Sequence, residues 1–215
     1  MKPHILKLAL LCALSSSAFA QQFNISPASP VLLGEPIAVT LNGLPANQDI
    51  KLSAERVMTE WGGNKRVVFR SEASFKADAN GALDLAGAAP KAGSYKGADA
   101  RGLFWSMKPV KGDVPADRKM MEVRLQAHTA DDKLLAESVI SMIESLPGVK
   151  TEPVAQFPGA LFALPPSANA GKVPAIILLG GSEGGSIVTR GAAQLASHGF
   201  AVLALPYYSP VDWQT

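Results

Sequence analysis

Cysteine is almost absent from this sequence. The chain of 215 residues contains one, Cys12, and three histidines. Because Cys12 lies in a leader that we expect to be removed, the rest of the chain can form no disulfide, use no cysteine nucleophile and offer no thiolate to a metal. No second histidine and no acidic cluster comes near His128 in the sequence. We therefore expect no metal site and no cofactor-binding site, and the sequence implies no cofactor.

The sequence also lacks an excess of charge of either sign. It has 20 Lys and Arg residues against 18 Asp and Glu residues. Lys2 and Lys7 fall in the leader, so the remaining chain is close to neutral. No run of Lys or Arg is interleaved with aromatic residues, which is the pattern expected of a nucleic-acid-binding surface. We therefore expect no nucleic-acid partner.

The first twenty residues predict an export signal. Lys2 and Lys7 form a positive start, Leu8–Leu14 is apolar, and Ala18–Ala20 has the small-x-small pattern of a cleavage site. The apolar part is too short to cross a bilayer as a stable helix. We expect cleavage after Ala20, no stable membrane anchor, and an exported protein that is periplasmic or secreted.

Residues 21–147 predict an Ig-like β-sandwich domain. Apolar and polar residues alternate along short segments that end at turn residues, as is typical of antiparallel sandwiches. The clearest segments are 37–41, 50–54, 67–75, 121–127 and 134–143. Asn80-Gly81, followed by Leu83 and Leu85, predicts a hairpin in which the strand at 67–75 turns back on itself.

Three features of this region bear on function. The irregular segment 93–114 is long for a compact domain, and such loops are often functional or interfacial. Trp61 and Trp105 are expected to anchor the core, since large aromatic side chains bury much apolar area. His128 falls on the polar face of its strand and is expected to be a surface histidine.

Residues 148–158 predict a linker, because prolines and glycines gather there as they do at domain boundaries. Residues 159–215 then predict the beginning of a second domain. Leu161–Leu164 is a short apolar strand, and Pro165-Pro166 ends it.

Two continuous apolar runs, Ala175–Leu179 and Phe200–Leu205, are typical of parallel strands covered on both faces. A helical pattern connects them and ends at Gly199, and His198 in its last turn is expected to be structural. The region therefore predicts the first strands and helix of an α/β domain. Two such strands and one helix do not complete a domain, so the chain looks truncated.

A glycine-rich turn, Gly180–Gly185, follows the first of these runs. As a phosphate-binding loop it fits poorly, because it lacks Gly-Lys-Ser/Thr and its glycines do not match G-x-G-x-x-G. As a nucleophile elbow it has the pattern G-x-S-x-G, with Ser182 at the centre. The base and acid available after Ser182 are His198 and Asp212, in the reverse of the order that this fold uses. This order disfavours Ser182 as a nucleophile.

The interpretation that we favour makes the turn an oxyanion-side loop formed by Gly180, Gly181 and Ser182. Its backbone N–H groups would point at a substrate carbonyl oxygen, and the start of the following helix adds a positive dipole end. Glycine permits such a close approach of the backbone. The remaining interpretation is a glycine turn without a functional role.

Four stretches, taken in order, resemble one family. They are Arg101–Met107, Gly159–Pro166, Gly180–Gly185 and Gly199–Tyr208. Their succession is similar to that of the acyl-CoA thioesterase and bile acid-CoA:amino acid N-acyltransferase family. The resemblance implies an N-terminal Ig-like sandwich followed by an α/β-hydrolase domain that cleaves or transfers acyl thioesters. It also implies a small-molecule acyl thioester or ester as the substrate of the full-length enzyme.

In that family the serine or cysteine nucleophile comes after the strand and helix that follow the position of Tyr207-Tyr208, and the acid and the histidine come later. The resemblance therefore implies no catalytic residue within this chain, with Ser182 as the one remaining candidate. We expect a fragment of an exported thioester hydrolase or acyltransferase. Two alternatives stay open: a non-catalytic β-sandwich module that binds a partner, and an esterase that depends on Ser182.

Overall fold

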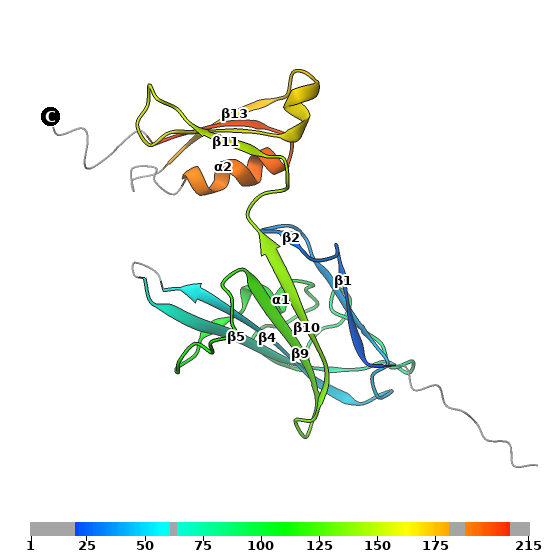
Figure 1. Ribbon diagram of the computed structural model, residues 1–215. Coiled ribbons are helices and arrows are strands. Elements are labelled where there is room, and N and C mark those ends of the chain that lie inside the picture. Colours follow the sequence, from blue (N-terminus) through cyan, green and yellow to red (C-terminus); the bar gives the residue numbers. More distant parts are fainter. Residues whose placement is uncertain (1–19, 61–63, 181–187, 207–215) are drawn as a thin grey trace, which may run out of the picture.

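The computed structural model describes residues 20–60, 64–180 and 188–206. The chain forms a large β-rich unit, coloured blue to green in Figure 1, and a smaller unit of strands and helix, coloured yellow to red. Residues 1–19 of the predicted export signal and Trp61 lie outside the described residues. No helix in the described ranges is both long and apolar enough to cross a membrane.

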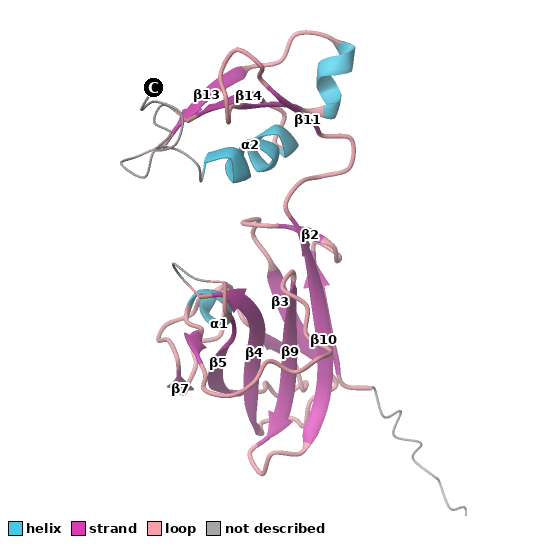
Figure 2. Cartoon of the chain, turned by 60° about the vertical axis from the view of Figure 1, so that its left-hand side comes forward, coloured by secondary structure: helices cyan, strands magenta, loops and turns pink. Residues whose placement is uncertain are grey.

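Two sheets make up the larger unit, and Figure 2 shows their strands from the side. The smaller sheet contains, in order, β1 (Gln22–Ser26), β3 (Ala38–Asn42) and β6 (Leu83–Asp84). The larger sheet contains, in order, β2 (Val31–Leu32), β10 (Leu134–Ile143), β9 (Glu122–Thr129), β4 (Asp49–Thr59), β5 (Arg66–Lys76) and β7 (Ala92–Gly93), and β8 (Lys108–Pro109) also pairs with β5. β2 runs parallel to β10, and the other described pairs of these sheets are antiparallel. The β-rich character predicted for this part of the chain is confirmed.

The core of the sandwich is built from alternate strand residues. In β4, Leu52 and Ala54 are buried, whereas Asp49 and Lys51 are exposed. Successive side chains of a strand point to opposite faces, so this alternation places every second residue between the sheets. The shared core includes Val39, Leu41, Phe75, Leu83, Leu103, Leu125 and Ile140. Burial of this apolar surface is the dominant force that holds the two sheets together.

The chain after β5 differs from the predicted hairpin. β5 pairs with β4, while Leu83 in β6 pairs with Leu41 in the other sheet. Asp78 shapes the turn at Asn80-Gly81, because its Oδ1 accepts a hydrogen bond of 2.8 Å from the backbone N–H of Asn80. The turn thus passes the chain from one sheet to the other. An Asn-Gly pair predicts that the chain turns, but it does not say which strand receives the returning chain.

The smaller unit is a sheet with a helix on one face. Its strand order is β11 (Lys150–Pro153), β12 (Leu161–Leu164), β14 (Ala201–Leu205) and β13 (Ala175–Leu179). A 3₁₀ helix, η1 (Pro166–Ala170), follows β12, and α2 (Val188–Ser197) connects β13 to β14. β13 and β14 are parallel, and β12 is antiparallel to β11 and β14. The strands expected from the two apolar runs and the helix between them are therefore present.

A second hydrophobic cluster, separate from that of the sandwich, holds α2 on its sheet. Ala192 and Ala196 are fully buried against Ala163, Val202 and Ala204. Small side chains on the helix face let it lie close to the sheet. Because the two clusters share no residue, each unit buries its own apolar surface.

Polar contacts join the carboxyl-terminal half of α2 to the sandwich. His198 Nε2 lies 3.0 Å from Glu35 Oε1, and Ser197 Oγ accepts a 2.9 Å hydrogen bond from the backbone N–H of Leu146. The Gln194 side-chain amide donates to the carbonyl oxygen of Leu33. His198, which is predicted to be structural, thus lies against a carboxylate of the other unit.

Candidate functional site

The predicted oxyanion-side loop begins at the carboxyl end of β13. Gly180 directly follows Leu179, the last residue of that strand, and Gly181 and Ser182 lie outside the described residues. The parallel register pairs Leu179 with Leu205, so Gly180 and Pro206 follow neighbouring strand ends at one edge of the sheet. In open α/β sheets, ligands bind outside this carboxyl edge. The position of Gly180 is therefore suitable for a substrate-facing turn.

The α2 helix begins at the same edge and ends at the opposite one. Its ten residues rise by about 1.5 Å each, which makes the helix about 15 Å long. His198 directly follows its last residue, near the start of β14, and its ring is engaged by Glu35. The structure thus places His198 away from the carboxyl edge where Gly180 lies. Asp212, the other candidate partner of Ser182, lies outside the described residues.

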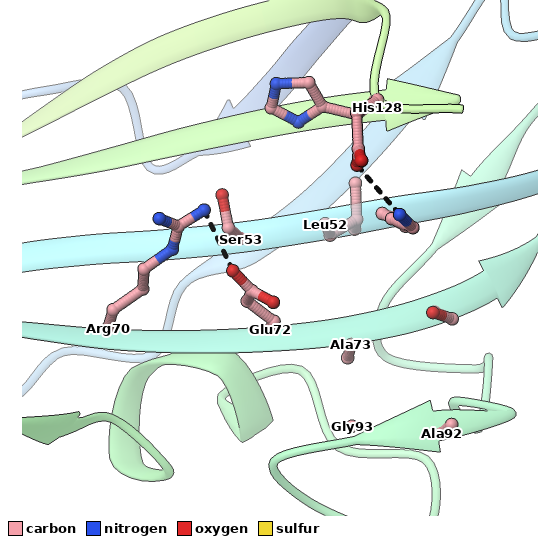
Figure 3. A pocket seen from close by; sticks show the side chains of 11 residues that line it. Leu52, Ser53, Arg70, Glu72, Ala73, Ala92, Gly93 and His128 are labelled. Atoms are coloured by element: carbon pink, nitrogen blue, oxygen red, sulfur yellow. Dashed lines mark hydrogen bonds and ion pairs between the residues drawn. The ribbon is translucent and has the colours of Figure 1, made fainter. Parts of the chain in front are cut away.

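A second candidate site is a hollow on the exposed face of the larger sheet, with a volume of about 600 Å³ (Figure 3). Its charged side chains pair with one another. Lys51 Nζ lies 2.8 Å from Asp132 Oδ1, and Arg70 Nη2 lies 2.9 Å from Glu72 Oε1. The hydrogen bond from Lys51 lowers the pKa of Asp132 below its usual value. His128 lines the same hollow beside these pairs.

This hollow does not have the arrangement of a hydrolytic site. A serine nucleophile needs a base within hydrogen-bond reach, and no hydroxyl in the described part of the chain is hydrogen-bonded to His128. Likewise, the described residues contain no group of three or more His, Cys, Asp or Glu side chains placed to hold a metal ion. The hollow is a polar sheet surface whose charges are internally neutralised. His128 lies on the polar face of β9, as predicted, but it is half-buried there rather than fully exposed.

The segment that includes Arg101–Met107 forms a short helix, α1 (Gly102–Trp105). Leu103 is buried in the core, but 60% of the surface of Trp105 is exposed. The indole Nε1 donates a 2.8 Å hydrogen bond to Asp99 Oδ2, and this hydrogen bond is the largest cause of the lowered pKa of Asp99. The prediction that Trp105 anchors the core is therefore wrong. A single turn of helix directs Leu103 inward, and Trp105 two residues later points outward.

Comparisons with known proteins find that this chain is similar to acyl-CoA thioesterases. The family model described as "Acyl-CoA thioester hydrolase/BAAT N-terminal region" matches residues 34–156. The chain is 37% identical over 199 residues to acyl-coenzyme A thioesterase 1 of Rattus norvegicus, covering 88% of this chain and 45% of the relative. It is 35% identical over 203 residues to acyl-coenzyme A thioesterase 6 of Mus musculus, covering 90% of this chain and 46% of the relative.

A third relative, the mitochondrial acyl-coenzyme A thioesterase 2 of Rattus norvegicus, is 36% identical over 199 residues, which cover 88% of this chain and 42% of the relative. The chain thus spans somewhat less than half the length of these relatives. The match to the family model covers most of the sandwich and the segment that leads out of it. On this basis, the chain belongs to the acyl-CoA thioester hydrolase/BAAT family.

Proposed function

We propose that this chain is the N-terminal part of an exported thioester hydrolase or acyltransferase that acts on small-molecule acyl thioesters or esters. The observation that carries the proposal is the β13–α2–β14 crossover, with Gly180 at the carboxyl end of β13, in a chain whose sandwich matches the family model. The names of its relatives specify acyl-CoA thioesterase activity. Acyl thioesters are therefore the first substrate class to test.

The proposal divides the chain into a signal peptide at 1–20, an Ig-like sandwich domain at 21–147, a linker at 148–158 and an incomplete α/β-hydrolase domain from 159 onward. Two separate hydrophobic clusters support the division, since each domain needs a core of its own. The predicted leader supports export.

The exposed side of the small sheet supports the α/β-hydrolase part of the proposal. β13 lies at the end of the strand order, and α2 packs on one face of the sheet. Ile177 and Leu179 on β13 are 66% and 56% exposed. Parallel sheets are normally covered on both faces, so this apolar surface fits a sheet that continues with further strands and helices.

In the proposed reaction, a serine or cysteine from the rest of the protein attacks the thioester carbonyl carbon. Negative charge then develops on the carbonyl oxygen, the C–S bond breaks, and the leaving thiol takes the proton that the nucleophile loses. Water or another acceptor then attacks the resulting acyl-enzyme, takes the acyl group and returns a proton to the nucleophile. In this proposal the glycine turn supplies backbone N–H donors to the developing oxyanion, from Gly181 or Ser182. Donors fixed in this way stabilise the transition state more than the ground state.

The experiment starts from the coding sequence read past the Thr215 codon and from the intact mass of the native protein. The complete protein is assayed for thiol release from an acyl-CoA and from a thioester without CoA. We expect Ser182→Ala to keep most of the activity, because the backbone N–H remains. We expect alanine at the nucleophile after Thr215 to abolish the activity.

Three results would contradict the proposal. One is a native protein that ends at Thr215 and has no hydrolytic activity, which favours the non-catalytic module. The second is a loss of about a thousandfold or more in kcat for Ser182→Ala, which identifies Ser182 as the nucleophile. The third concerns export alone: an N-terminus of the native protein that still carries residues 1–20 excludes cleavage after Ala20.

A further inference from the structure

The end of the sandwich nearest α2 holds a second pocket, which we call the end pocket. It has a volume of about 170 Å³ and lies between β4, β9, β10, α1 and the segment after β2. The residues that matter for its chemistry are Arg56, Met58, Arg101, Met107, Val123 and Met142. Arg101 and Met107 belong to a stretch that carries the family resemblance, but the sequence patterns assign a binding role to none of the six.

Arg56 occupies a core-facing position of β4. The register of β4 and β9 places Arg56 opposite Val123, a buried core residue, so Arg56 lies on the core-facing side of β4 and is half-buried there. The Arg56 Nε donates a 3.3 Å hydrogen bond to the carbonyl oxygen of Met120. Partial burial lowers the pKa of the Arg56 guanidinium below its usual value. A positive charge thus stands where the alternation of β4 places apolar side chains.

This charge has no acidic partner in the described part of the chain. Neighbouring arginines on the same unit do have one: Arg118 Nε, for example, lies 2.8 Å from Glu55 Oε1. Glu35 lines the end pocket, but its carboxylate is engaged by His198. A partly buried charge without a partner costs stability. The Nη donors of Arg56 are therefore available to an anion that enters the pocket.

The walls of the end pocket are apolar and adaptable. Met58, Met107 and Met142 come from three different parts of the chain and line it together with Val123. Methionine side chains are flexible and polarisable, and they fit irregular apolar ligands well. Arg101 at the same pocket is exposed and adds a second positive charge, which acts on Asp99 nearby but forms no ion pair within the described ranges.

We propose that the end pocket binds an unbranched carboxylate, with the carboxylate on Arg56 and the alkyl chain among the methionines. The Arg56 guanidinium can hold a planar carboxylate through two parallel hydrogen bonds. The methionine walls match an alkyl chain but offer nothing to a polar headgroup. This binding belongs to the sandwich and does not depend on the proposed hydrolytic function.

The test is a calorimetric titration of the 215-residue chain with octanoate, alongside acetate and octanol as probes that carry the charge alone or the chain alone. We expect saturable binding of octanoate with one site per chain, and affinities lower by about tenfold or more for acetate and octanol. Octanoate that does not saturate, or octanol that binds as tightly as octanoate, would overturn the proposal.

Variants locate the site. Arg56→Gln should weaken octanoate binding by about tenfold, since a charge-assisted hydrogen bond is lost. Arg70→Gln is the matched control, because Arg70 lies on the adjacent strand in the other hollow and should leave the affinity unchanged. Equal affinities in the wild type and Arg56→Gln, or equal losses in the two variants, would overturn the assignment.

Two further measurements keep the proposal testable if Arg56→Gln does not fold. Arg101→Gln changes an exposed side chain and should weaken octanoate binding several-fold without altering the melting temperature. In the wild type, the labelled methyl signals of Met58, Met107 and Met142 should shift on octanoate addition, while that of Met121, outside the pocket, should not. A shift confined to Met121 would place the ligand elsewhere and overturn the proposal.

Discussion

Gly102 lies so close to Tyr95 that a Cβ added to it would fall 2.1 Å from Cε2 of the tyrosine ring. This contact seats α1 on the sandwich, and Leu103 next to it is buried in the core. The Trp105 ring, at the other end of α1, packs against Tyr95 edge-on with ring centroids 6.0 Å apart. The wall that α1 gives to the end pocket therefore depends on the absence of a side chain at residue 102.

The first prediction is that Gly102→Ala destabilises the protein. The added methyl group must displace the Tyr95 ring, and overpacking of this kind costs about 1–3 kcal/mol in the free energy of unfolding. Urea denaturation followed by tryptophan fluorescence measures the change. Gly87→Ala is the control, since the nearest atom to a Cβ there is 3.8 Å away, and its effect should stay within about 0.5 kcal/mol. Equal midpoints for the two variants would contradict the packing argument.

Tyr95 also makes the stability depend on pH at the alkaline end. Burial, and secondarily the charge of Asp99, raise the pKa of Tyr95 to about 12. In the unfolded chain the phenol ionises near its model value of 10.0. Because the unfolded state loses its proton first, stability contributed by the neutral phenol is complete below pH 10 and is lost as the pH rises toward 12.

We therefore expect the free energy of unfolding to fall by about 1–3 kcal/mol between pH 10 and 12 through Tyr95. Tyr95→Phe should remove this part of the fall. At neutral pH the same variant should cost little, because the Tyr95 hydroxyl is buried without a partner among the described residues. Urea titrations of both proteins across this range measure the difference. Parallel stability curves would refute the assignment.

The ion pair between Arg118 and Glu55 should matter more than those of the sheet-face hollow. Its side chains are 21% and 20% exposed, against 46% and 77% for Lys51 and Asp132. The hydrogen bond that Arg118 donates to Glu55 is also the largest cause of the raised pKa of Arg118. We expect Glu55→Gln to lower the free energy of unfolding by about 1–2 kcal/mol, and Asp132→Asn by less than about 1 kcal/mol. The reverse ranking in urea denaturation would show that solvent screening does not decide these energies.

Most strands could be predicted from the sequence because their pattern is local. Alternation at 121–127 and 134–143 leads directly to β9 and β10, and the apolar run Ala175–Leu179 has the bounds of β13. The partner of a strand is a non-local property, so the sequence predicts a hairpin at Asn80-Gly81 where the structure pairs β6 with β3 of the other sheet. The helix α1 also escaped prediction, because four residues are too few to show a helical period.

The binding chemistry was harder to predict than the fold. Gly180 could be assigned to a strand end because a glycine-rich turn after an apolar run is a recognisable pattern. Arg56 could not be identified as a binding residue from the sequence, because a charged residue near the end of a strand usually lies on the surface. Its significance depends on neighbours from β9, β10 and α1 that are distant in the sequence. One feature of the sequence does point to Arg56: it comes two residues after Ala54 and therefore lies on the same face of β4 as that buried residue.

The last prediction concerns the apolar face of β13 that α2 leaves open. Ile177 and Leu179 point away from the helix, whereas Leu178 packs in the cluster beneath it. Exposed apolar side chains on the end strand of a sheet promote association between chains. We expect the 215-residue chain to associate as its concentration rises, and Ile177→Thr with Leu179→Thr to suppress this without lowering the melting temperature. Sedimentation velocity measures the association.

Val139→Thr serves as the control, because Val139 is a partly exposed residue of the sandwich, at 39%, and should not change the association. A chain that sediments as a monomer at every concentration would contradict the prediction and favour a self-sufficient module. If only the double substitution at Ile177 and Leu179 suppresses association, the apolar face of β13 is the surface through which the chains associate. A continuing α/β sheet would then cover this face in the complete protein, because each added βα unit buries the strand before it.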